Sequence, residues 1–210
     1  MSQYDDRKDY AKGALDEGGF QPEQALRLWL DEAKAADPTD YNAMTLSTLG
    51  EDGHPDARIV LLRHLEEAPL SIHFYTNYRS AKGRQLMAHP HASATFFWRE
   101  LERQLRIRGR VEPLPEAVSD AYFSSRPRAS QLGAWASEQS EPISGRDALE
   151  QQRQSVEGEH PEDVARPPHW GGFRLHVDEL EFWQGRPGRL HDRLLCRRDS
   201  GAWTVGRLQP

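Results

Sequence analysis

The stretch from Tyr122 to Trp135 (YFSSRPRASQLGAW) gathers residue types that bind anions. Arginine presents a fixed fork of N–H donors and hydroxyl groups add neutral donors, so this stretch could grip a phosphate or a carboxylate. Tyr122 and Arg126 are four residues apart and would share a face if one helix contained both. Pro127 then favours the first turn of a second helix, with Ser125 or Arg126 near its cap. An ordinary solvated helix pair remains the alternative from this stretch alone.

Further candidate anion ligands lie elsewhere, and no glycine-rich phosphate loop accompanies them. Arg58 and Arg63 fall on one predicted strand, and Ser80 with Lys82 starts a predicted helix. Side chains and helix N-termini would therefore have to hold any phosphate. Taken singly, residues of these types are more often solvated surface residues than ligands.

A third candidate is the segment RLHDR at residues 189–193. Arg189, His191 and Arg193 alternate, so a strand would point all three to one face. Two arginines beside a histidine favour a bound anion, although an exposed edge strand would also tolerate them. The histidines show no HxxxH or HExxH spacing, and no GxSxG elbow occurs, so the sequence predicts neither a metal site nor a serine triad.

Composition limits the remaining classes of function. The chain has 210 residues with a net charge of -6, which argues against nucleic-acid binding by bulk attraction. Cys196 is the single cysteine, so no disulfide can form within the chain. The polar N-terminus and the lack of a long apolar run predict a cytoplasmic protein with no membrane partner.

The hydrophobic pattern predicts mostly strands. We expect strands at residues 43–49, 57–64, 71–76, 91–98, 102–111, 172–177, 179–184, 193–198 and 202–208. We expect helices from Pro22, over 80–88, from Pro115 and over 146–157, and a loop over 158–168. Short spacers between strands favour an antiparallel barrel with helices on its flank. Residues 1–19 are predicted to be a mobile arm, and residues 20–210 a single domain.

Taken together, the segments resemble the pyridoxine/pyridoxamine 5′-phosphate oxidases over nearly the whole chain. The motifs that carry the resemblance are ARIVLLR (57–63), FYTN (74–77), LERQ (101–104), YFSSRPRASQLGAW (122–135), SEQS (137–140), WGGFR (170–174), EFWQG (181–185) and RLHDR (189–193). The resemblance implies a β-dominated α+β fold, an antiparallel split β-barrel with flanking helices. It also implies a homodimer with FMN bound between the subunits.

The resemblance implies a set of flavin-binding residues. These are Arg58, Arg63, Tyr75, Thr76, Ser80, Lys82, Gln104, Gln139, Ser140, Trp183 and Arg193. Arg58 and Arg63 match positions near the flavin phosphate, and Gln104 matches a contact to the isoalloxazine ring. Gln139 and Ser140 match a contact that comes from the partner subunit.

The resemblance also implies substrate-binding residues, namely Arg63, Tyr122, Arg126, Ser130, Arg189, His191, Arg7 and Tyr10. Tyr122, Arg126 and Ser130 match the grip on the substrate phosphate. Arg189 and His191 match residues against the substrate ring and are the catalytic candidates. Arg7 and Tyr10 lie where some members close a lid. The implied reaction is oxidation of pyridoxamine or pyridoxine 5′-phosphate to pyridoxal 5′-phosphate, with O₂ as acceptor and H₂O₂ as product.

Two positions depart from the family pattern. The family commonly has lysine at Arg63, and arginine at Ala81, where Arg79 is the candidate substitute. Loss of one charge-assisted contact predicts FMN binding weaker by about 1.5–3 kcal/mol. Two alternatives stay open: a related flavin oxidase of phenazine biosynthesis, and a split-barrel protein that binds flavin without catalysis.

Overall fold

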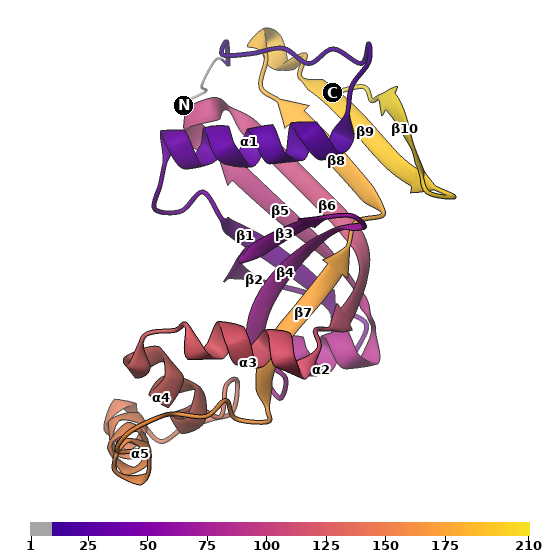
Figure 1. The fold of residues 1–210 in the computed structure, drawn as a ribbon. Helices are drawn as coiled ribbons and strands as arrows, with labels where there is room; N and C mark the ends of the chain where they lie inside the picture. Colours follow the sequence, from indigo (N-terminus) through magenta and orange to yellow (C-terminus); the bar gives the residue numbers. More distant parts are fainter. Residues whose placement is uncertain (1–9) are drawn as a thin grey trace.

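The computed structural model describes residues 10–210, and antiparallel β-sheet dominates it (Figure 1). The helices are α1 (Pro22–Ala36), α2 (Ala81–Ala88), α3 (Glu116–Ser124), α4 (Arg128–Ala136) and α5 (Arg146–Glu159), with short 3-10 turns η1 (Arg99–Leu101) and η2 (Pro187–Arg189). The strands are β1 (Ala43–Leu49), β2 (Pro55–Leu61), β3 (His64–Glu67), β4 (Leu70–Asn77), β5 (His91–Trp98), β6 (Arg103–Pro113), β7 (Trp170–His176), β8 (Glu179–Gln184), β9 (Asp192–Asp199) and β10 (Ala202–Arg207). The predicted fold, an antiparallel split barrel with flanking helices, is confirmed.

The barrel splits along β6. Strands run in the order β10-β9-β8-β6-β5-β1-β2, while β3, β4 and β7 form a second group that joins through β7 and β6. The first part of β6, Arg103 to Arg108, pairs with β8, and its last part, Val111 to Pro113, pairs with β7. Between the two parts a Cβ on Gly109 would lie 1.7 Å from the carbonyl oxygen of His176. Glycine at this position therefore lets the chain leave one partner strand for the other.

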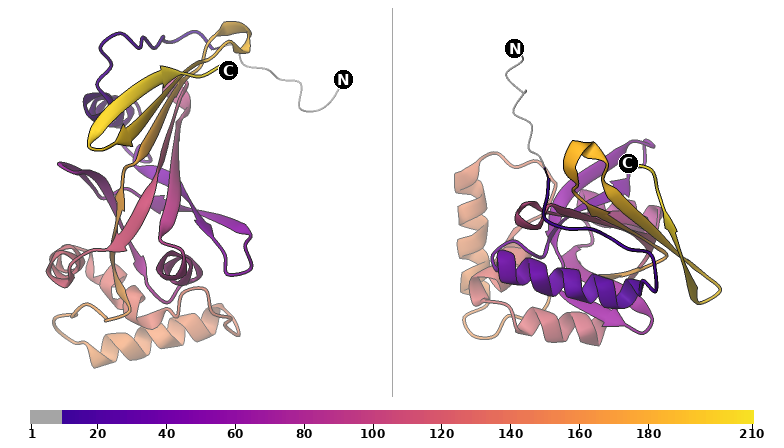
Figure 2. Two further views of the ribbon diagram at one scale, coloured as in Figure 1. Left: turned by 90° about the vertical axis from the view of Figure 1, so that its right-hand side faces the viewer. Right: turned by 90° about the horizontal axis from the view of Figure 1, so that it is seen from above.

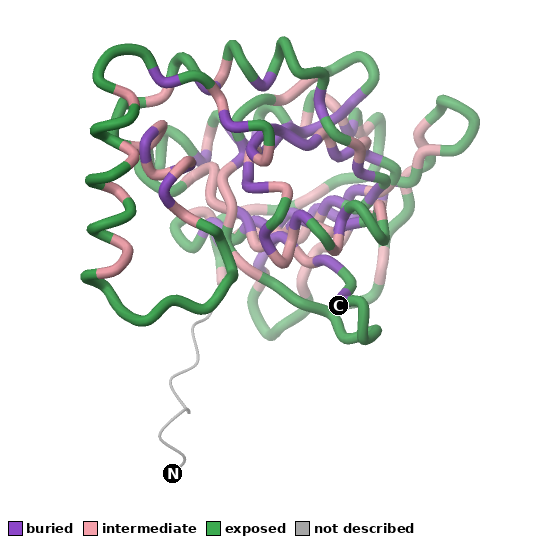
Figure 3. The backbone as a smooth tube through the Cα atoms, turned by 90° about the horizontal axis from the view of Figure 1, so that it is seen from below, coloured by how far each residue is buried: buried purple, intermediate pink, exposed green. Residues whose placement is uncertain are grey.

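The core fills the barrel and the space under α1. Leu105, Ile107, Gly109 and Val111 of β6 are all buried, as the period-two pattern predicts. The predicted apolar face of α1 (Leu26, Trp29, Leu30 and Ala33) is also buried, and the helix lies across β5, β6 and β8 (Figure 1). Buried segments gather in the middle of the molecule, whereas the outermost helices are mostly exposed (Figure 3).

Helices α3, α4 and α5 lie at the other end of the barrel from α1 (Figures 1 and 2). A second apolar cluster holds them there, and its centre is formed by Phe123, Leu132, Val164 and Trp170. Gln131 donates to the carbonyl oxygen of Phe123 at 3.0 Å, so this part of the 122–135 stretch joins α4 to α3.

Two predicted boundaries are wrong. The strand predicted over 57–64 is two strands, because the backbone changes partners at its end: Leu62 N donates to Asn42, and Arg63 N donates to His73. Helix α5 runs to Glu159, two residues into the predicted loop. Of the predicted arm, residues 1–9 lie outside the described residues, and the division at residue 19 stays a prediction.

Candidate functional site

The predicted ligand residues form two groups at opposite ends of the protomer (Figures 1 and 2). The first group lies around β4, α2 and the α3–α4 helices and contains Arg58, Arg63, Tyr75, Thr76, Ser80, Lys82, Tyr122, Arg126, Ser130, Gln139 and Ser140. The second lies where β6, β8 and β9 meet beside η2 and contains Gln104, Trp183, Arg189, His191, Arg193 and Tyr10. Arg7 lies outside the described residues.

Lys82 is the centre of the first group. Its ammonium donates to Gln139 Oε1 at 2.7 Å, to Thr76 Oγ1 at 3.3 Å and to Ser80 Oγ at 3.4 Å. Ser80 also caps α2, because its hydroxyl accepts from Gly83 N. These three partners are neutral oxygens, so the ammonium is oriented without its charge being neutralised by them.

The charge at Lys82 is further destabilised by its surroundings. Burial, and then the nearby charge of Arg58, lower the pKa of Lys82, although Asp56 opposes this. Arg58 pairs with Asp56 and donates to Thr48 Oγ1 at 2.5 Å. A phosphate group would offset the electrostatic repulsion between Lys82 and Arg58. This set of donors therefore fits the phosphate of a nucleotide cofactor.

Gln139 and Ser140 approach Lys82 within a single protomer. Besides the Gln139–Lys82 contact, Ser140 Oγ accepts from the backbone N–H of Ala81 at 3.1 Å. The chain that follows α4 returns against the start of α2, so both residues lie beside Lys82 of their own chain. That they contact the flavin from the partner subunit stays a prediction. Arg79, the proposed substitute for the missing arginine, is exposed.

Arg126 is the second cation of this group. The guanidinium lies 4.4 Å from the ring centroid of Trp170, and its buried Nη1 has no hydrogen-bond partner among the described residues. Burial lowers the pKa of Arg126; the charge of the exposed Arg63 lowers it further, while Tyr122 opposes the shift. A buried donor without a partner is costly, so this group is suited to receive an anion.

The geometry around Arg126 differs from the prediction in one respect. Helix α3 ends at Ser124, so Tyr122 and Arg126 do not share a helix, and Pro127 itself caps α4. Proline has no backbone N–H and disfavours helix at the residue before it, which separates the two helices here. The ring of Tyr122 instead stacks on Tyr75, with centroids 3.8 Å apart.

A cavity of about 260 Å³ lies beside Arg126. Its wall includes Arg126, Ser130 and Gln139, the last of which also binds Lys82. Asn77 and Ser137 line it too, and they were missed as site residues although the FYTN and SEQS motifs contain them. Asn77 Nδ2 donates to the carbonyl oxygen of Ser137 at 3.4 Å, which ties β4 to the end of α4.

The second group begins with a row of neighbours on adjacent strands. Gln104 on β6 is opposite Trp183 on β8, which in turn is opposite Arg193 on β9. Arg193 Nε donates at 2.8 Å to Glu181, a buried carboxylate that also accepts from Arg106 at 2.7 Å. Glu181 was missed by the sequence reasoning, although an acidic residue two positions before Trp183 on the same face could have indicated it.

Arg189, His191 and Arg193 do not lie on one strand, so that prediction is wrong. Arg189 ends the turn η2 with a φ of 63°, His191 lies in the link after it, and only Arg193 belongs to β9. His191 Nδ1 accepts from the backbone N–H of Arg186 at 3.1 Å, so the neutral ring carries its proton on Nε2. Burial, and then the charge of Arg189, lower the pKa of His191.

Aromatic rings close around His191. The His191 ring centroid lies 4.6 Å from that of Trp183, and Tyr10 meets both rings edge-on at 5.8 Å and 5.7 Å. A flat heteroaromatic ring can pack against such a cluster while His191 donates a hydrogen bond to it. The end that contains His191 is therefore suited to bind an aromatic ring, and the end that contains Lys82 and Arg126 is suited to bind phosphate.

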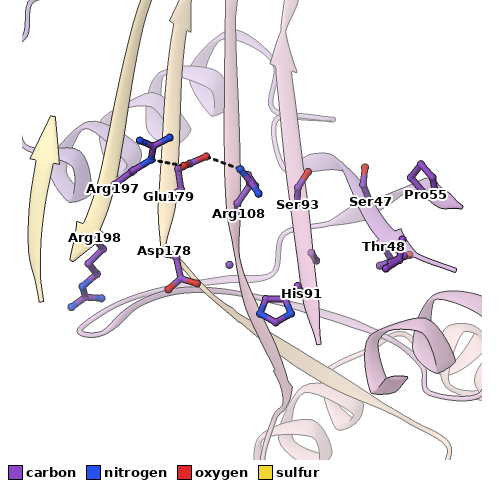
Figure 4. Close-up of a pocket in the computed structure, with 13 residues that line it drawn as sticks. Ser47, Thr48, Pro55, His91, Ser93, Arg108, Asp178, Glu179, Arg197 and Arg198 are labelled. Atoms are coloured by element: carbon purple, nitrogen blue, oxygen red, sulfur yellow. Dashed lines mark hydrogen bonds and ion pairs between the residues drawn. The ribbon is translucent and has the colours of Figure 1, made fainter. Parts of the chain in front are cut away.

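Another hollow, of about 500 Å³, lies on the open face of the main sheet (Figure 4). Arg108 and Arg197 on its floor both pair with Glu179, at 3.2 Å and 3.0 Å. None of the predicted ligand residues within 10–210 lines it. No helix of that same range has the length and apolar character to cross a membrane, and the cytoplasmic location stays a prediction.

Known proteins resemble this chain over nearly its whole length. The family described as "Pyridoxamine 5'-phosphate oxidase" matches residues 30–159, and the "Pyridoxine 5'-phosphate oxidase C-terminal dimerisation region" matches residues 170–210. Pyridoxine/pyridoxamine 5′-phosphate oxidases of Burkholderia lata and Thermosynechococcus vestitus are each 50% identical to the chain, with 97% of both chains covered.

Two solved structures also resemble this chain in fold. PhzG from Burkholderia lata, in complex with tetrahydrophenazine-1-carboxylic acid, has a TM-score of 0.84 and 30% identity over 100% of this chain and 97% of its own. A pyridoxamine 5′-phosphate oxidase-related FMN-binding protein of Nostoc punctiforme shares the fold, with a TM-score of 0.74 at 18% identity over 91% of this chain and 99% of its own. With two family regions that together match most of its length and relatives at half identity, the chain belongs to the pyridoxamine 5′-phosphate oxidase family of oxidoreductases.

Proposed function

We propose that the protein oxidises pyridoxamine 5′-phosphate or pyridoxine 5′-phosphate to pyridoxal 5′-phosphate, with O₂ as acceptor and H₂O₂ as product. The observation that carries this proposal is the Arg126 guanidinium, whose buried Nη1 faces no hydrogen-bond partner within the described residues. It shares a cavity wall with Gln139, which binds Lys82. Neighbouring anion-binding groups at Lys82 and Arg126 suit a phosphorylated cofactor beside a phosphorylated substrate.

FMN is the cofactor of this family, and the residues around Lys82 fit its phosphate. Lys82 and Arg58 would supply charge, while Thr76 and Ser80 would add hydroxyl donors and Ser140 a third. When bound, the flavin would supply the two-electron redox chemistry, with O₂ as the final electron acceptor. The protein residues contribute binding, orientation and electrostatics.

On the substrate side, the residues divide between the phosphate and the ring. Arg126 would form a charge-assisted pair with the substrate phosphate, with Tyr122 and Ser130 as neutral donors. His191, protonated on Nε2, would donate to the substrate ring, and Arg189 would help to orient that ring. We assign neither residue as an obligatory base, because hydride removal leaves no proton that a base must take from carbon.

Completion of the site requires a second copy of the chain. The Arg126 and Lys82 grips lie at one end of the protomer, and Trp183, His191 and Arg193 lie at the other (Figure 1). The C-terminal dimerisation region, residues 170–210, contains Trp183, His191 and Arg193. We propose a homodimer in which each copy supplies its Trp183 end to the phosphate grips of the other.

The test is a visible spectrum of the purified protein, with and without added FMN, followed by a peroxide assay on pyridoxamine 5′-phosphate. We expect a yellow protein that forms pyridoxal 5′-phosphate and one equivalent of H₂O₂ per turnover. Lys82→Ala should lose flavin, whereas Arg126→Ala should keep flavin and lose affinity for substrate. A yellow protein that forms no peroxide with any phosphorylated B6 vitamer would instead support non-catalytic flavin binding.

A second candidate substrate class is suggested by PhzG, whose structure holds tetrahydrophenazine-1-carboxylic acid and matches the whole chain. The carboxylate of that acid would also pair with Arg126. A tricyclic acid without a phosphate would, however, use fewer of the donors that Ser130 and Arg63 add. Comparing turnover of pyridoxamine 5′-phosphate with that of a dihydrophenazine carboxylate decides between the two classes.

A further inference from the structure

Several side chains hold the chain segment before α1 against the end of the sheet where β6 begins. Arg186 contacts Gly13, Asp192 and Arg207 contact Leu15, and Glu102 makes the contacts nearest to Tyr10. The backbone N–H groups of Ala11 and Lys12 both donate to Oε2 of Glu102, at 2.8 Å and 3.0 Å. Lys12 Nζ also donates to the carbonyl oxygen of Glu100 at 2.7 Å. In Figure 1 this segment crosses the end of the molecule beside the β8–β9 connection, far from α3 and α4.

Glu102 occupies an unusual position for its residue type. It is 3% exposed, and its backbone is left-handed with φ 54° and ψ 40°. Its carbonyl oxygen accepts from Gly185 N at 2.8 Å and from Gln184 Nε2 at 3.2 Å. Left-handed backbone at a residue other than glycine and burial of a carboxylate both cost free energy. The hydrogen bonds from Ala11 and Lys12 to the carboxylate offset part of that cost.

The hydrogen bonds from Ala11 and Lys12 to Glu102 fix the position of the adjacent residue, Tyr10. Tyr10 directly precedes the two N–H donors, and its ring meets Trp183 and His191 edge-on. Beneath it a Cβ on Gly185 would lie 2.6 Å from Tyr10 Cγ, so the tyrosine is seated in a space that only glycine leaves open. Displacement of residues 11 and 12 would therefore withdraw Tyr10 from the ring end of the site.

We propose that Glu102 is a positioning residue, whose carboxylate holds the backbone at Ala11 and Lys12 and thereby keeps Tyr10 against Trp183 and His191. The resemblance implies that Tyr10 belongs to a lid over the site, and Glu102 holds the backbone of that lid in place. The fastening itself does not depend on the substrate. Its kinetic consequence rests on the proposed function, because it is read from turnover of the phosphorylated vitamer.

The physical test is limited proteolysis of the flavin-loaded protein with trypsin, followed at the Lys12–Gly13 bond by mass spectrometry. Cleavage requires the segment to leave the sheet, so its rate reports the population of the released state. We expect Glu102→Ala to raise this rate at least tenfold, and Glu102→Gln to raise it less because an amide oxygen still accepts. Glu100→Ala is the matched control, since only its backbone oxygen contacts Lys12.

Cleavage within α5, after Arg146 or Arg153, controls for general loosening, because that helix has no buried residue. Should Glu102→Ala melt well below the wild type, Glu102→Gln alone is used for the comparison. Equal cleavage at Lys12 in the Glu102 and Glu100 variants would refute the fastening, whatever the protein oxidises.

The functional test is a double-mutant cycle with Tyr10→Ala. If Glu102 acts through Tyr10, Glu102→Ala should raise KM for pyridoxamine 5′-phosphate several-fold in the wild-type background and have little effect when Tyr10 is already alanine. Additive effects would contradict a role through Tyr10. If the wild type itself shows no turnover, the proposed function fails while the proteolysis result still stands.

Discussion

The guanidinium of Arg126 lies over Trp170, 4.4 Å from the ring centroid, with one buried nitrogen that no described residue satisfies. The aromatic face holds the cation in place without using its hydrogen-bond donors. Arginine held in this way is available to an anion that enters the cavity. The arrangement shows how the folded protein can keep a costly buried donor free for an anion.

Replacement of Arg126 by alanine should weaken substrate binding specifically. Loss of one charge-assisted phosphate contact is worth about 1.5–3 kcal/mol, so we expect KM for pyridoxamine 5′-phosphate to rise about 10- to 150-fold. Flavin content, measured from the visible spectrum, should stay near that of the wild type. Unphosphorylated pyridoxamine serves as the control substrate, and its KM should change little. An unchanged KM for the phosphorylated substrate would remove Arg126 from the site.

The missing arginine at Ala81 gives a gain-of-affinity prediction. Ala81 is the first residue of α2, between Ser80 and Lys82, and its side chain is partly exposed. Ala81→Arg should add one donor to the flavin phosphate and lower the dissociation constant for FMN about 10- to 150-fold in a fluorescence titration. Ala88→Arg places the same residue at the exposed far end of α2 and should leave the affinity as it is. Equal affinities of Ala81→Arg and the wild type would show that the departure at this position has no cost.

Assembly through the open sheet face gives a third prediction. Ile59 and Phe97 are 63% and 56% exposed, and strand alternation places them on the face opposite the core residues Leu46 and Phe96. Phe97→Glu should convert a dimer to a monomer in sedimentation velocity and weaken FMN binding, because the Trp183 end of the partner would be lost.

Leu28→Glu is the matched control for this experiment. Leu28 is 55% exposed but lies on α1, away from that sheet face. The control should remain dimeric with its flavin affinity intact. A Phe97→Glu protein that stays dimeric would place the interface elsewhere.

The acid limb of the pH–rate profile should report His191. Its pKa is lowered by burial and by Arg189, so the ring stays neutral below its ordinary value of about 6.5. Protonation puts a proton on Nδ1, which then cannot accept from the N–H of Arg186. We therefore expect kcat/KM to fall as pH drops through a value below 6.5, and to be fully recovered above it.

Arg189→Ala removes one cause of the depressed pKa of His191. The acid limb should then move to higher pH, in addition to any loss of rate. Arg197→Ala, a matched substitution on β9 that breaks the ion pair with Glu179 and lies away from His191, should leave the limb in place. A limb unmoved by Arg189→Ala would assign that ionisation to another group.

The sequence by itself determined most of the sheet and the types of residue at the site. Alternation along 102–111 gave the inward and outward faces of β6, because the side-chain period of a strand is a local property. It likewise determined the buried face of α1 and the motifs around Lys82, Arg126 and His191.

Only the tertiary structure decided which of these residues meet. Gln139 reaches Lys82 across 57 positions of chain, and Glu102 reaches Ala11 across 91, and neither contact follows from any local period. Local pattern also misplaced Arg126 and Arg189, which lie in the connections after α3 and at η2, where backbone direction depends on what packs beneath. Lys82 and Arg126 are separated from Trp183 and His191 within one chain, because the barrel carries the two pairs at opposite ends.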